Sequence, residues 1–342
     1  MSDRFWARVV IVAFNSGKVL QKCIDHLDCV KDQDFEVVIV DNNPIDGSTD
    51  NLSLPNDRYT VLKSKKNNGF SGGSNLGAAG ANTEWIFTLN PDAFVNKNWL
   101  NECKLAIKKF PNYGMISPLL LNEKDHSIID GCGDVLSLFG HSWRGGYQQT
   151  ANNAPQEYCQ VFAPSGACAG YRRDLFQKAS GFDSSFFCYK EDVDLGLRLN
   201  RMGETCIYVP KAIVYHIGSS TLEDRHPIIL YYSYRNNMFV IAKNFPVINL
   251  IIALPIFTTS VLWIILRNLH LKGNAHIVRG LAVGLVQTPF LIFKRIFNPL
   301  LKTSTKSSIY FPMNASRNDL RESSICNRVI KGSVAVRGEM TP

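Results

Sequence analysis

Two acidic clusters in this chain have residue types and surroundings that suit catalysis. The first is Asn90–Asp92, which directly follows an apolar run at residues 85–89 that is typical of a β-strand. The second contains Glu191, Asp192 and Asp194, lies about a hundred residues further on, and begins an amphipathic helical pattern. A carboxylate after a strand can hold a metal ion bound to phosphate, and one on a helix can act as a general base. The second cluster also has a purely structural explanation, because the helix dipole stabilises acidic residues in a first turn.

A third polar position follows another apolar run. Asp41 comes directly after residues 37–40, where its carboxylate can accept a hydrogen bond from a pyrimidine base or a ribose hydroxyl. Glycines at positions 69, 72 and 73 lack the Cβ atoms that keep a ligand away from the backbone, although glycines also serve tight turns and close packing. Their spacing is not GxGxxG followed by an acidic residue after the next strand, so a dinucleotide-dependent dehydrogenase is disfavoured.

Apolar runs alternate with helical patterns over the first ninety or so residues. The runs at residues 9–14 and 37–40 suit strands buried on both faces, and those at 59–62 and 85–89 are expected to be two further strands. A helical pattern separates the first two runs, and a small-residue helix from Gly72 to about residue 82 is expected before the last. This β-α-β-β-α-β order predicts an α/β fold with a mostly parallel, mixed sheet flanked by helices.

Composition limits the class of protein. The chain has 342 residues, which exceeds one average domain, and 45% of them are hydrophobic, which excludes a largely disordered chain. The formal net charge of +8 suits anionic substrates, anionic lipid or nucleic acid without choosing among them. The nine cysteines include no CxxC pair, so neither a zinc site nor a disulfide framework is indicated. Reduced thiols in a cytosolic setting are therefore expected, and no apolar segment before the first strand suggests secretion.

The motifs occur in one order along the chain: Val9–Asn15, Val40–Asn43 with Asp46–Ser48, Asn68–Gly77, Leu89–Asp92, Gly181–Asp183, Glu191–Leu195 and Val214–His216. In this order and spacing they resemble glycosyltransferase family 2. The resemblance covers roughly residues 7–240. Within the family, the chain is most similar to the bacterial rhamnosyltransferase-type enzymes of O-antigen and cell-wall assembly.

The resemblance implies a GT-A fold and assigns chemical roles to residues of both acidic clusters and to His216. Asp92 stands at the last position of the family's DxD motif and would be the principal protein ligand of Mg²⁺ or Mn²⁺. Asn90 replaces the first Asp of that motif, and His216 matches a position that completes the metal site. Asp192 matches the catalytic base, with Glu191 beside it.

The resemblance also implies contacts to both substrates. Arg198 would steady either the diphosphate or the helix that carries Asp192. The residues expected at the nucleotide sugar are Phe14, Asn15, Asp41, Asn68, Gly69, Asn75, Asn90 and Arg198, and those expected at the acceptor are Ser165, Gly166 and Glu191.

Three regions are expected: a catalytic domain at residues 1–240, an apolar helical membrane-associated region at 241–302, and a polar flexible tail at 303–342. Residues 244–266 carry no charge and are long enough to cross a bilayer core of about 30 Å, with a kink expected at Pro255. A second uncharged run at 280–293 is predicted to be too short to span. Basic residues flank both runs, so we expect attachment to the cytoplasmic face of the inner membrane. The alternative is a helical pair packed against the catalytic domain or a partner subunit.

The predicted function is inverting, metal-dependent transfer of a sugar from a dTDP- or UDP-linked donor, with dTDP-rhamnose as the expected case. The acceptor would be a lipid-linked molecule or a glycan in cell-surface polysaccharide biosynthesis, and nucleic acid is not an expected partner. A processive polysaccharide synthase is an alternative, but its QxxRW motif is absent and Tyr234–Asn237 occupies that region. An inactive membrane-bound scaffold of the same fold is another, and Asn90 is the feature that favours it.

Overall fold

The computed structural model of the chain describes residues 5–43, 45–218 and 226–296. Its first part contains β1 (Ala7–Ala13), α1 (Gly17–Asp28), β2 (Phe35–Asp41), β3 (Tyr59–Lys63), α2 (Gly69–Ala78) and β4 (Trp85–Leu89). The β-α-β-β-α-β order predicted from the apolar runs is therefore confirmed. The tail predicted at residues 303–342, and residues 297–302 of the predicted membrane-associated region, lie outside the described residues.

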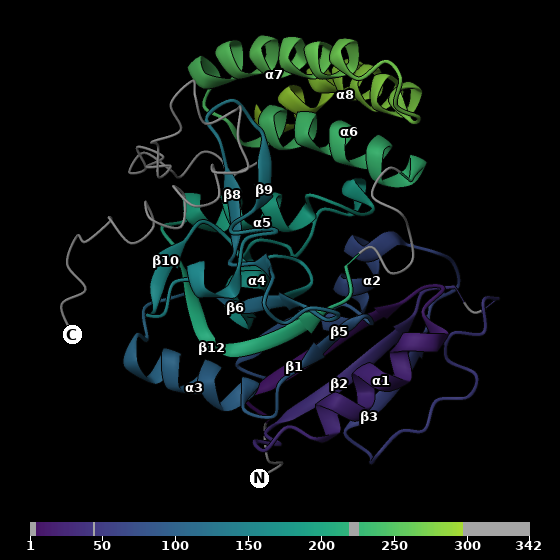
Figure 1. Cartoon of the computed structure of the whole chain (residues 1–342), viewed down its shortest axis with the longest axis vertical. Coiled ribbons are helices and arrows are strands. Elements are labelled where there is room, and N and C mark those ends of the chain that lie inside the picture. Colours follow the sequence, from purple (N-terminus) through teal and green to yellow (C-terminus); the bar gives the residue numbers. More distant parts are fainter. Residues whose placement is uncertain (1–4, 44, 219–225, 297–342) are drawn as a thin grey trace.

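The second part of the chain adds further strands, most of them three residues long, and a helical layer. Its elements are β5 (Ala93–Val95), α3 (Trp99–Lys109), β6 (Met115–Asn122), β7 (Ile129–Gly131), β8 (Asp134–Leu136), β9 (Ser142–Arg144), the 3-10 helix η1 (Ala151–Asn153), β10 (Cys159–Val161), β11 (Cys168–Arg172), α4 (Arg173–Lys178), the 3-10 helix η2 (Ser184–Phe186), α5 (Glu191–Arg201), β12 (Cys206–His216), α6 (Pro227–Asn244), α7 (Val247–Arg267) and α8 (Asn274–Ile296). Helices α6, α7 and α8 form a layer on one side of the sheet, with the β8–β9 hairpin between them and the sheet (Figure 1).

The main sheet has the order β10-β12-β6-β11-β4-β1-β2-β3. Strands β4, β1, β2 and β3 are parallel neighbours, and β12 is parallel to β6. Strand β11 is antiparallel to both β4 and β6, so the two parallel groups run in the same direction. The carboxyl ends of β1, β2, β4 and β12 therefore share one edge of the sheet, which is where ligands bind in open α/β folds.

Helix α2 lies very close to the sheet because glycines face it. A Cβ atom on Gly77 would lie 2.4 Å from Val10 Cγ1, and one on Gly73 would lie 2.7 Å from Val12 Cγ1. The helix begins at Gly69 and ends at Ala78, so the range predicted for it, from Gly72 to about residue 82, is wrong at both ends. It ends early because Ala79 adopts an extended backbone conformation.

The uncharged run at residues 280–293, predicted to be too short to span a membrane, is part of a longer helix. The helix continues beyond the uncharged run in both directions, so that α8 has 23 residues and contains Arg279 and Pro289. Counting only uncharged residues underestimates such a helix, because basic residues near its ends stay helical. Helices α7 and α8 are both long and apolar enough to cross a membrane, by length and composition alone.

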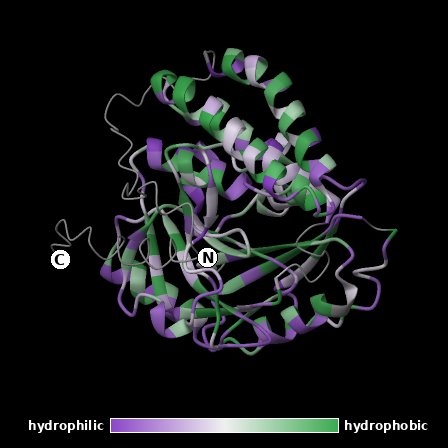
Figure 2. Ribbon diagram, turned by 45° about the horizontal axis from the view of Figure 1, so that its top comes forward, coloured by the Kyte–Doolittle hydropathy of each residue, from purple (hydrophilic) through white to green (hydrophobic). Residues whose placement is uncertain are grey.

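Two helices of the layer, α6 and α8, are packed closely against each other. Helix α8 follows α6 so closely that a Cβ on Gly280 would lie 2.4 Å from the Tyr231 carbonyl oxygen, and one on Gly284 would lie 2.7 Å from Met238 Cγ. In Figure 2 much of this layer carries the hydrophobic colour, including parts that face away from the sheet. The predicted boundary after residue 240 falls inside α6, and the division of the chain there stays a prediction.

A buried ion network joins the layer to α5. Asp194 is fully buried, and its carboxylate accepts hydrogen bonds from Arg198 Nε at 2.9 Å, Lys243 Nζ at 2.8 Å and Asn244 Nδ2 at 2.8 Å. Burial alone would raise the pKa of Asp194, but the charges of Lys243 and Arg198 outweigh it and lower that pKa. Because Lys243 and Asn244 belong to α6, this carboxylate anchors the helical layer to the helix that carries the second acidic cluster.

We predict that Asp194→Asn destabilises the protein by about 3–5 kcal/mol, because it leaves buried cationic partners without a counter-charge. Urea unfolding of the full chain in detergent measures this change. The matched control is Asp174→Asn, which breaks the largely exposed Arg172–Asp174 ion pair and should cost less than about 1 kcal/mol. Equal losses in the two variants would show that the Asp194 network does not carry this stability.

Candidate active site

Asp92 and His216 come together at the carboxyl edge of the sheet. Asp92 lies three residues beyond β4, and His216 is the last residue of β12. Strand β5 pairs with β12 so that Ala93 is opposite His216, which places the neighbouring Asp92 beside the imidazole. His216 Nε2 lies 3.4 Å from Asp92 Oδ1 and 3.5 Å from Asn90 Nδ2. The two predicted metal ligands are thus adjacent.

A second carboxylate, Asp130, orients the imidazole from its other side. Asp130 Oδ2 lies 2.8 Å from His216 Nδ1 and also pairs with the guanidinium of Arg144. Burial opposes protonation of His216, but the hydrogen bonds and charges of Asp130 and Asp92 outweigh it and raise the pKa of His216 to about 9. Metal-binding histidines commonly have such an orienting carboxylate. Sequence reasoning missed Asp130 because it lies on a three-residue strand with no clear periodicity.

The donor set at this edge fits a divalent metal ion only in part. Asp92 supplies a carboxylate, which hard cations prefer, and His216 Nε2 faces the same carboxylate. Among the described residues no group of three or more histidine, cysteine and acidic side chains could hold an ion by itself. The arrangement therefore suits an ion whose remaining ligands are substrate and water oxygens.

Asp41 presents an unpaired oxygen at the end of β2. Its carboxylate is 2% exposed, and Oδ2 accepts a hydrogen bond from Thr49 Oγ1 at 2.7 Å. Oδ1 is buried and has no hydrogen-bond partner among the residues that the structure describes. Nearby, at the end of β1, Phe14 is 38% exposed, and Asn15 has a left-handed backbone and donates its N–H to Asp46. Asp41 Oδ1 is therefore available to accept a hydrogen bond from a polar group of a ligand.

Gly69 and Asn68 form the start of α2 next to a loop from the second half of the chain. Gly69 has a φ of +68°, and a Cβ there would lie 2.2 Å from the carbonyl oxygen of Phe187. The Asn68 side chain donates to Ser64 Oγ at 2.7 Å, and its backbone N–H donates to Asn42 Oδ1 at 3.0 Å. The structure therefore shows Asn68 holding the turn before α2, and Gly69 allowing the two halves of the chain to approach.

Asn75 and Arg198 are engaged in contacts within the protein. The Asn75 amide bonds both the N–H and the carbonyl of Phe182, at 2.9 and 2.7 Å. Arg198 binds Asp194 and donates to the carbonyl oxygens of Ala179 and Gly181. Of the two roles expected for Arg198, these contacts match support of the helix that carries Asp192 rather than support of the diphosphate.

The second acidic cluster lies in the first turn of α5. Asp192 accepts hydrogen bonds from the backbone N–H groups of Gly166 and Val193, each at 2.8 Å, which fixes the direction of its carboxylate. Ser165 and Gly166, the residues expected at the acceptor, are thereby placed beside Asp192. Glu191 is 5% exposed, and its Oε2 has no hydrogen-bond partner within the described part of the chain. Burial, with Asp192 adding to it, raises the pKa of Glu191 well above its usual range.

A further carboxyl group, Asp134 of β8, lies against Asp192 and was also missed from the sequence. It is 5% exposed, its backbone N–H donates to the Ala163 carbonyl at 2.7 Å, and its side chain shares a hydrogen bond with Asp192. Burial and the charge of Asp192 raise the pKa of Asp134 well above its usual range. Asp134 therefore keeps its proton to a higher pH than an ordinary aspartic acid.

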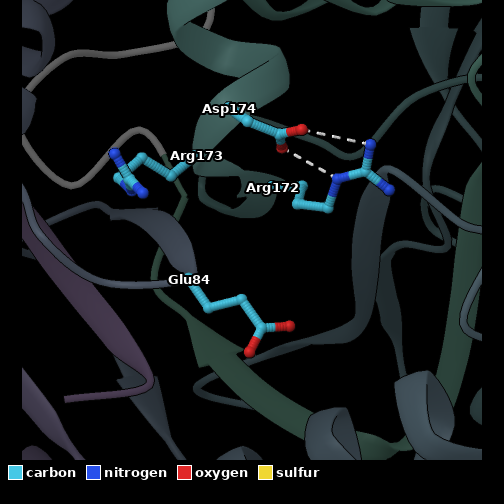
Figure 3. Close-up of a pocket in the computed structure, with 4 residues that line it drawn as sticks. All are labelled: Glu84, Arg172, Arg173 and Asp174. Carbon is cyan, nitrogen blue, oxygen red and sulfur yellow. Dashed lines mark hydrogen bonds and ion pairs between the residues drawn. The ribbon is translucent and has the colours of Figure 1, made fainter. Parts of the chain in front are cut away.

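The pKa of Tyr189 is influenced by a carboxylate from each of the two acidic clusters. Burial raises its pKa most, and the neighbouring Cys188, Glu191 and Asp92 raise it further. The hydroxyl thus lies within electrostatic reach of one carboxylate from each cluster. The separate shallow pocket in Figure 3, lined by Glu84 and Arg172–Asp174, contains none of the predicted site residues, and its Arg172 is paired with Asp174.

The profile of Glycosyl transferase family 2 matches residues 8–179, about half of the chain. The chain belongs to glycosyltransferase family 2. This glycosyltransferase is 26% identical over 241 residues to the N-acetylglucosaminyl-diphospho-decaprenol L-rhamnosyltransferase of Mycobacterium tuberculosis, covering 63% of this chain and 78% of that protein. It is also 26% identical over 227 residues to the rhamnosyltransferase WbbL of Escherichia coli, covering 61% and 82% of the two chains.

Solved structures confirm the GT-A fold of the glycosyltransferase. GalNAc-T7 with UDP, GalNAc and Mn²⁺ superimposes with a TM-score of 0.56 at 17% identity, covering 71% of this chain and 48% of that one. The mannosyltransferase PcManGT of Pyrobaculum calidifontis, in complex with GDP-Man and Mn²⁺, gives 0.50 at 14% identity, with coverages of 84% and 88%. At these identities the likeness extends to the fold alone.

We predict that Asp134→Asn stabilises the glycosyltransferase increasingly as the pH rises. In the natural protein the folded carboxyl keeps its proton where the unfolded chain has released it. The free energy of unfolding therefore falls from about pH 4 upward until the raised pKa is passed, by at most about 1.4 kcal/mol per pH unit. Asparagine has no proton to lose and can still donate to Asp192. Urea unfolding of both proteins at pH 5 and pH 8 measures the difference, and an equal difference at the two pH values contradicts the prediction.

Proposed function

We propose that this glycosyltransferase is an inverting, metal-dependent enzyme that transfers rhamnose from dTDP-rhamnose to a lipid-linked or glycan acceptor in cell-surface polysaccharide biosynthesis. The observation that carries the proposal is the pairing of Asp92 with His216 at the carboxyl edge of the sheet, with Glu191 and Asp92 both near enough to Tyr189 to raise its pKa. The choice of rhamnose rests on the two relatives that are named rhamnosyltransferases. The lipid-linked acceptor rests on the name of the mycobacterial relative.

In this proposal the donor binds across the carboxyl edge of the sheet. Asp41 Oδ1 accepts a hydrogen bond from the base or the ribose, and Phe14 and Asn15 border the same position. Asp92 and His216 hold Mg²⁺ or Mn²⁺ together with the diphosphate, and Asn90 lies beside them. A bound divalent ion would neutralise the charge that develops on the leaving diphosphate. Both solved relatives described above contain Mn²⁺ with a nucleotide or nucleotide sugar, which supports a metal-dependent site.

Asp192 acts as the general base in this proposal. Its carboxylate is fixed by the backbone N–H groups of Gly166 and Val193, so that it can take the proton of an acceptor hydroxyl that lies near Ser165 and Gly166. The deprotonated oxygen attacks the anomeric carbon opposite the leaving diphosphate, which inverts that centre. The buried Glu191 oxygen that has no partner among the described residues is available to a second acceptor hydroxyl.

We also propose that α7 and α8 attach the enzyme to the cytoplasmic face of the inner membrane. Large apolar side chains are exposed along both helices, at Val247, Ile248, Ile251, Ile252, Ile256, Leu262, Trp263, Leu266, Val278, Leu285, Val286, Phe290 and Phe293. Basic residues at the helix ends, among them Arg267, Lys272 and Lys294, suit the anionic headgroups of that leaflet. Attachment there would bring the active site to a lipid-linked acceptor.

We predict that Asp192→Asn lowers kcat about 10²–10⁴-fold while leaving Mn²⁺-dependent binding of dTDP nearly unchanged, because it removes only the base. Asp92→Ala should instead abolish the Mn²⁺-dependent part of dTDP binding. The measurements are dTDP release from dTDP-rhamnose and calorimetric titration of dTDP with and without Mn²⁺. Near-normal turnover by Asp192→Asn would overturn the base assignment, and turnover of UDP- or GDP-linked sugars alone would overturn the choice of donor.

We predict that replacing Ile251, Trp263 and Leu266 together by glutamine moves the protein out of the membrane fraction. Burying each such side chain is worth about 1.5–3 kcal/mol, so that partitioning should fall more than about 100-fold. Sedimentation with membranes after a salt wash measures it. The control is Leu105→Gln, an exposed apolar residue of α3 that should not alter sedimentation. Retention of the triple variant in the pellet would contradict attachment through this surface.

A further inference from the structure

The loop that leads into α5 is held in an unfavourable backbone conformation. Phe187, Tyr189 and Lys190 have φ angles of 66°, 67° and 69°, in the left-handed region that side chains other than glycine rarely adopt. Lys190 is the N-cap of α5, and Glu191 and Asp192 follow it directly. Such conformations persist only where the surroundings enforce them, and they cluster at functional sites.

The hydrogen bonds that hold this conformation come from the side-chain amide of Asn236, a fully buried residue of α6. Asn236 Nδ2 lies 3.0, 2.8 and 2.7 Å from the carbonyl oxygens of Phe186, Cys188 and Tyr189. An amide nitrogen has two hydrogens, so the three carbonyls share two donors. The Asn236 oxygen in turn accepts from Arg235 Nε at 2.8 Å.

Arg235 donates further hydrogen bonds to the same segment of backbone. Its Nη2 donates to the carbonyl oxygens of Ser185 and Phe186, at 2.8 and 2.9 Å. The guanidinium lies over the ring of Tyr232, and that ring stacks on Phe187 with a centroid distance of 5.2 Å. Helix α6 thus binds the backbone of this loop from Ser185 to Tyr189.

The loop also contacts the side of the site where the nucleotide is expected. The carbonyl of Phe187 accepts a hydrogen bond from the Ser71 N–H at 3.1 Å and lies against Gly69. The direction of the Phe187–Lys190 backbone therefore determines how the first turn of α5 faces the donor half. An error of about 1 Å between reacting groups can cost about 100-fold in rate.

We propose that Asn236 is a positioning residue for the transfer reaction, whose amide holds the loop carbonyls so that Glu191 and Asp192 face the substrates. This inference rests on the proposed function, in which Asp192 is the base. Asn236 itself contacts only the protein backbone and Arg235 in these interactions, and it acts through the loop.

The test compares Asn236→Leu with Asn237→Leu in the full chain. Asn237 is the next residue of α6 and is also buried. Its side chain accepts a hydrogen bond from Ser142 Oγ at 3.1 Å, whereas that of Asn236 donates to the loop carbonyls. For Asn236→Leu we expect kcat for dTDP release from dTDP-rhamnose to fall about 100-fold, with Mn²⁺-dependent dTDP affinity within about twofold of the natural protein. Asn237→Leu should lower the melting temperature without this selective loss of kcat.

A second substitution tests the strain directly. Glycine adopts a left-handed conformation without help, so that Lys190→Gly added to Asn236→Leu should restore kcat at least about tenfold. Asn236→Asp, which keeps the shape and removes the N–H donors, serves as the alternative where the leucine variant does not fold. A folded Asn236 variant with near-normal kcat would overturn the proposal. Parallel loss of kcat and dTDP affinity, or failure of both Asn236 variants to fold, would also overturn it.

Amide hydrogen exchange separates this inference from the proposed function. Asn236→Leu should speed exchange of the amides from Cys188 to Val193, and Asn237→Leu should not. If the natural protein turns over no sugar nucleotide, the proposed function fails while the exchange result still tests the role of Asn236. Unchanged exchange in an active Asn236→Leu protein would refute the inference alone.

Discussion

The buried charge of Asp194 constrains the arrangement of the whole molecule. A carboxylate with no exposure is tolerated only with cationic partners, and these come from Arg198 of the same helix and Lys243 of α6. Helix α5 and the helical layer are consequently parts of one packed body. The same α6 carries the Asn236 amide that binds the loop before α5, and α8 packs directly against it.

Much of the first half of the chain could be predicted because strands β1, β2 and β4 are largely buried. Val9–Val12 and Val37–Val40 form continuous apolar runs, and the parallel order of such strands brings Asp41 and Asp92 to one edge. The second half was predicted less well because most of its strands are only three residues long. Asp130 and Asp134 lie on three-residue strands whose partners are set by tertiary contacts rather than by periodicity.

Motif spacing identified polar positions without showing which way their side chains point. Asn75 and Arg198 occupy positions that match the family, and here they bind the backbone of the 179–182 turn. Asp92 and His216 instead face each other. Whether a side chain faces the site or the protein backbone depends on helix orientation and, for Asn75, on the path of a turn more than a hundred residues away. Neither is encoded in local sequence.

The unpaired oxygen of Asp41 has a consequence for selectivity among nucleotides. A buried acceptor without a donor costs free energy of folding. A ligand that donates a hydrogen bond to Asp41 Oδ1 would recover that free energy on binding. A uracil or thymine ring presents an N–H at position 3, whereas cytosine has a lone pair there. A base facing Asp41 through that atom would be accepted in the first case and repelled in the second, because two acceptors would then oppose each other in a dry pocket.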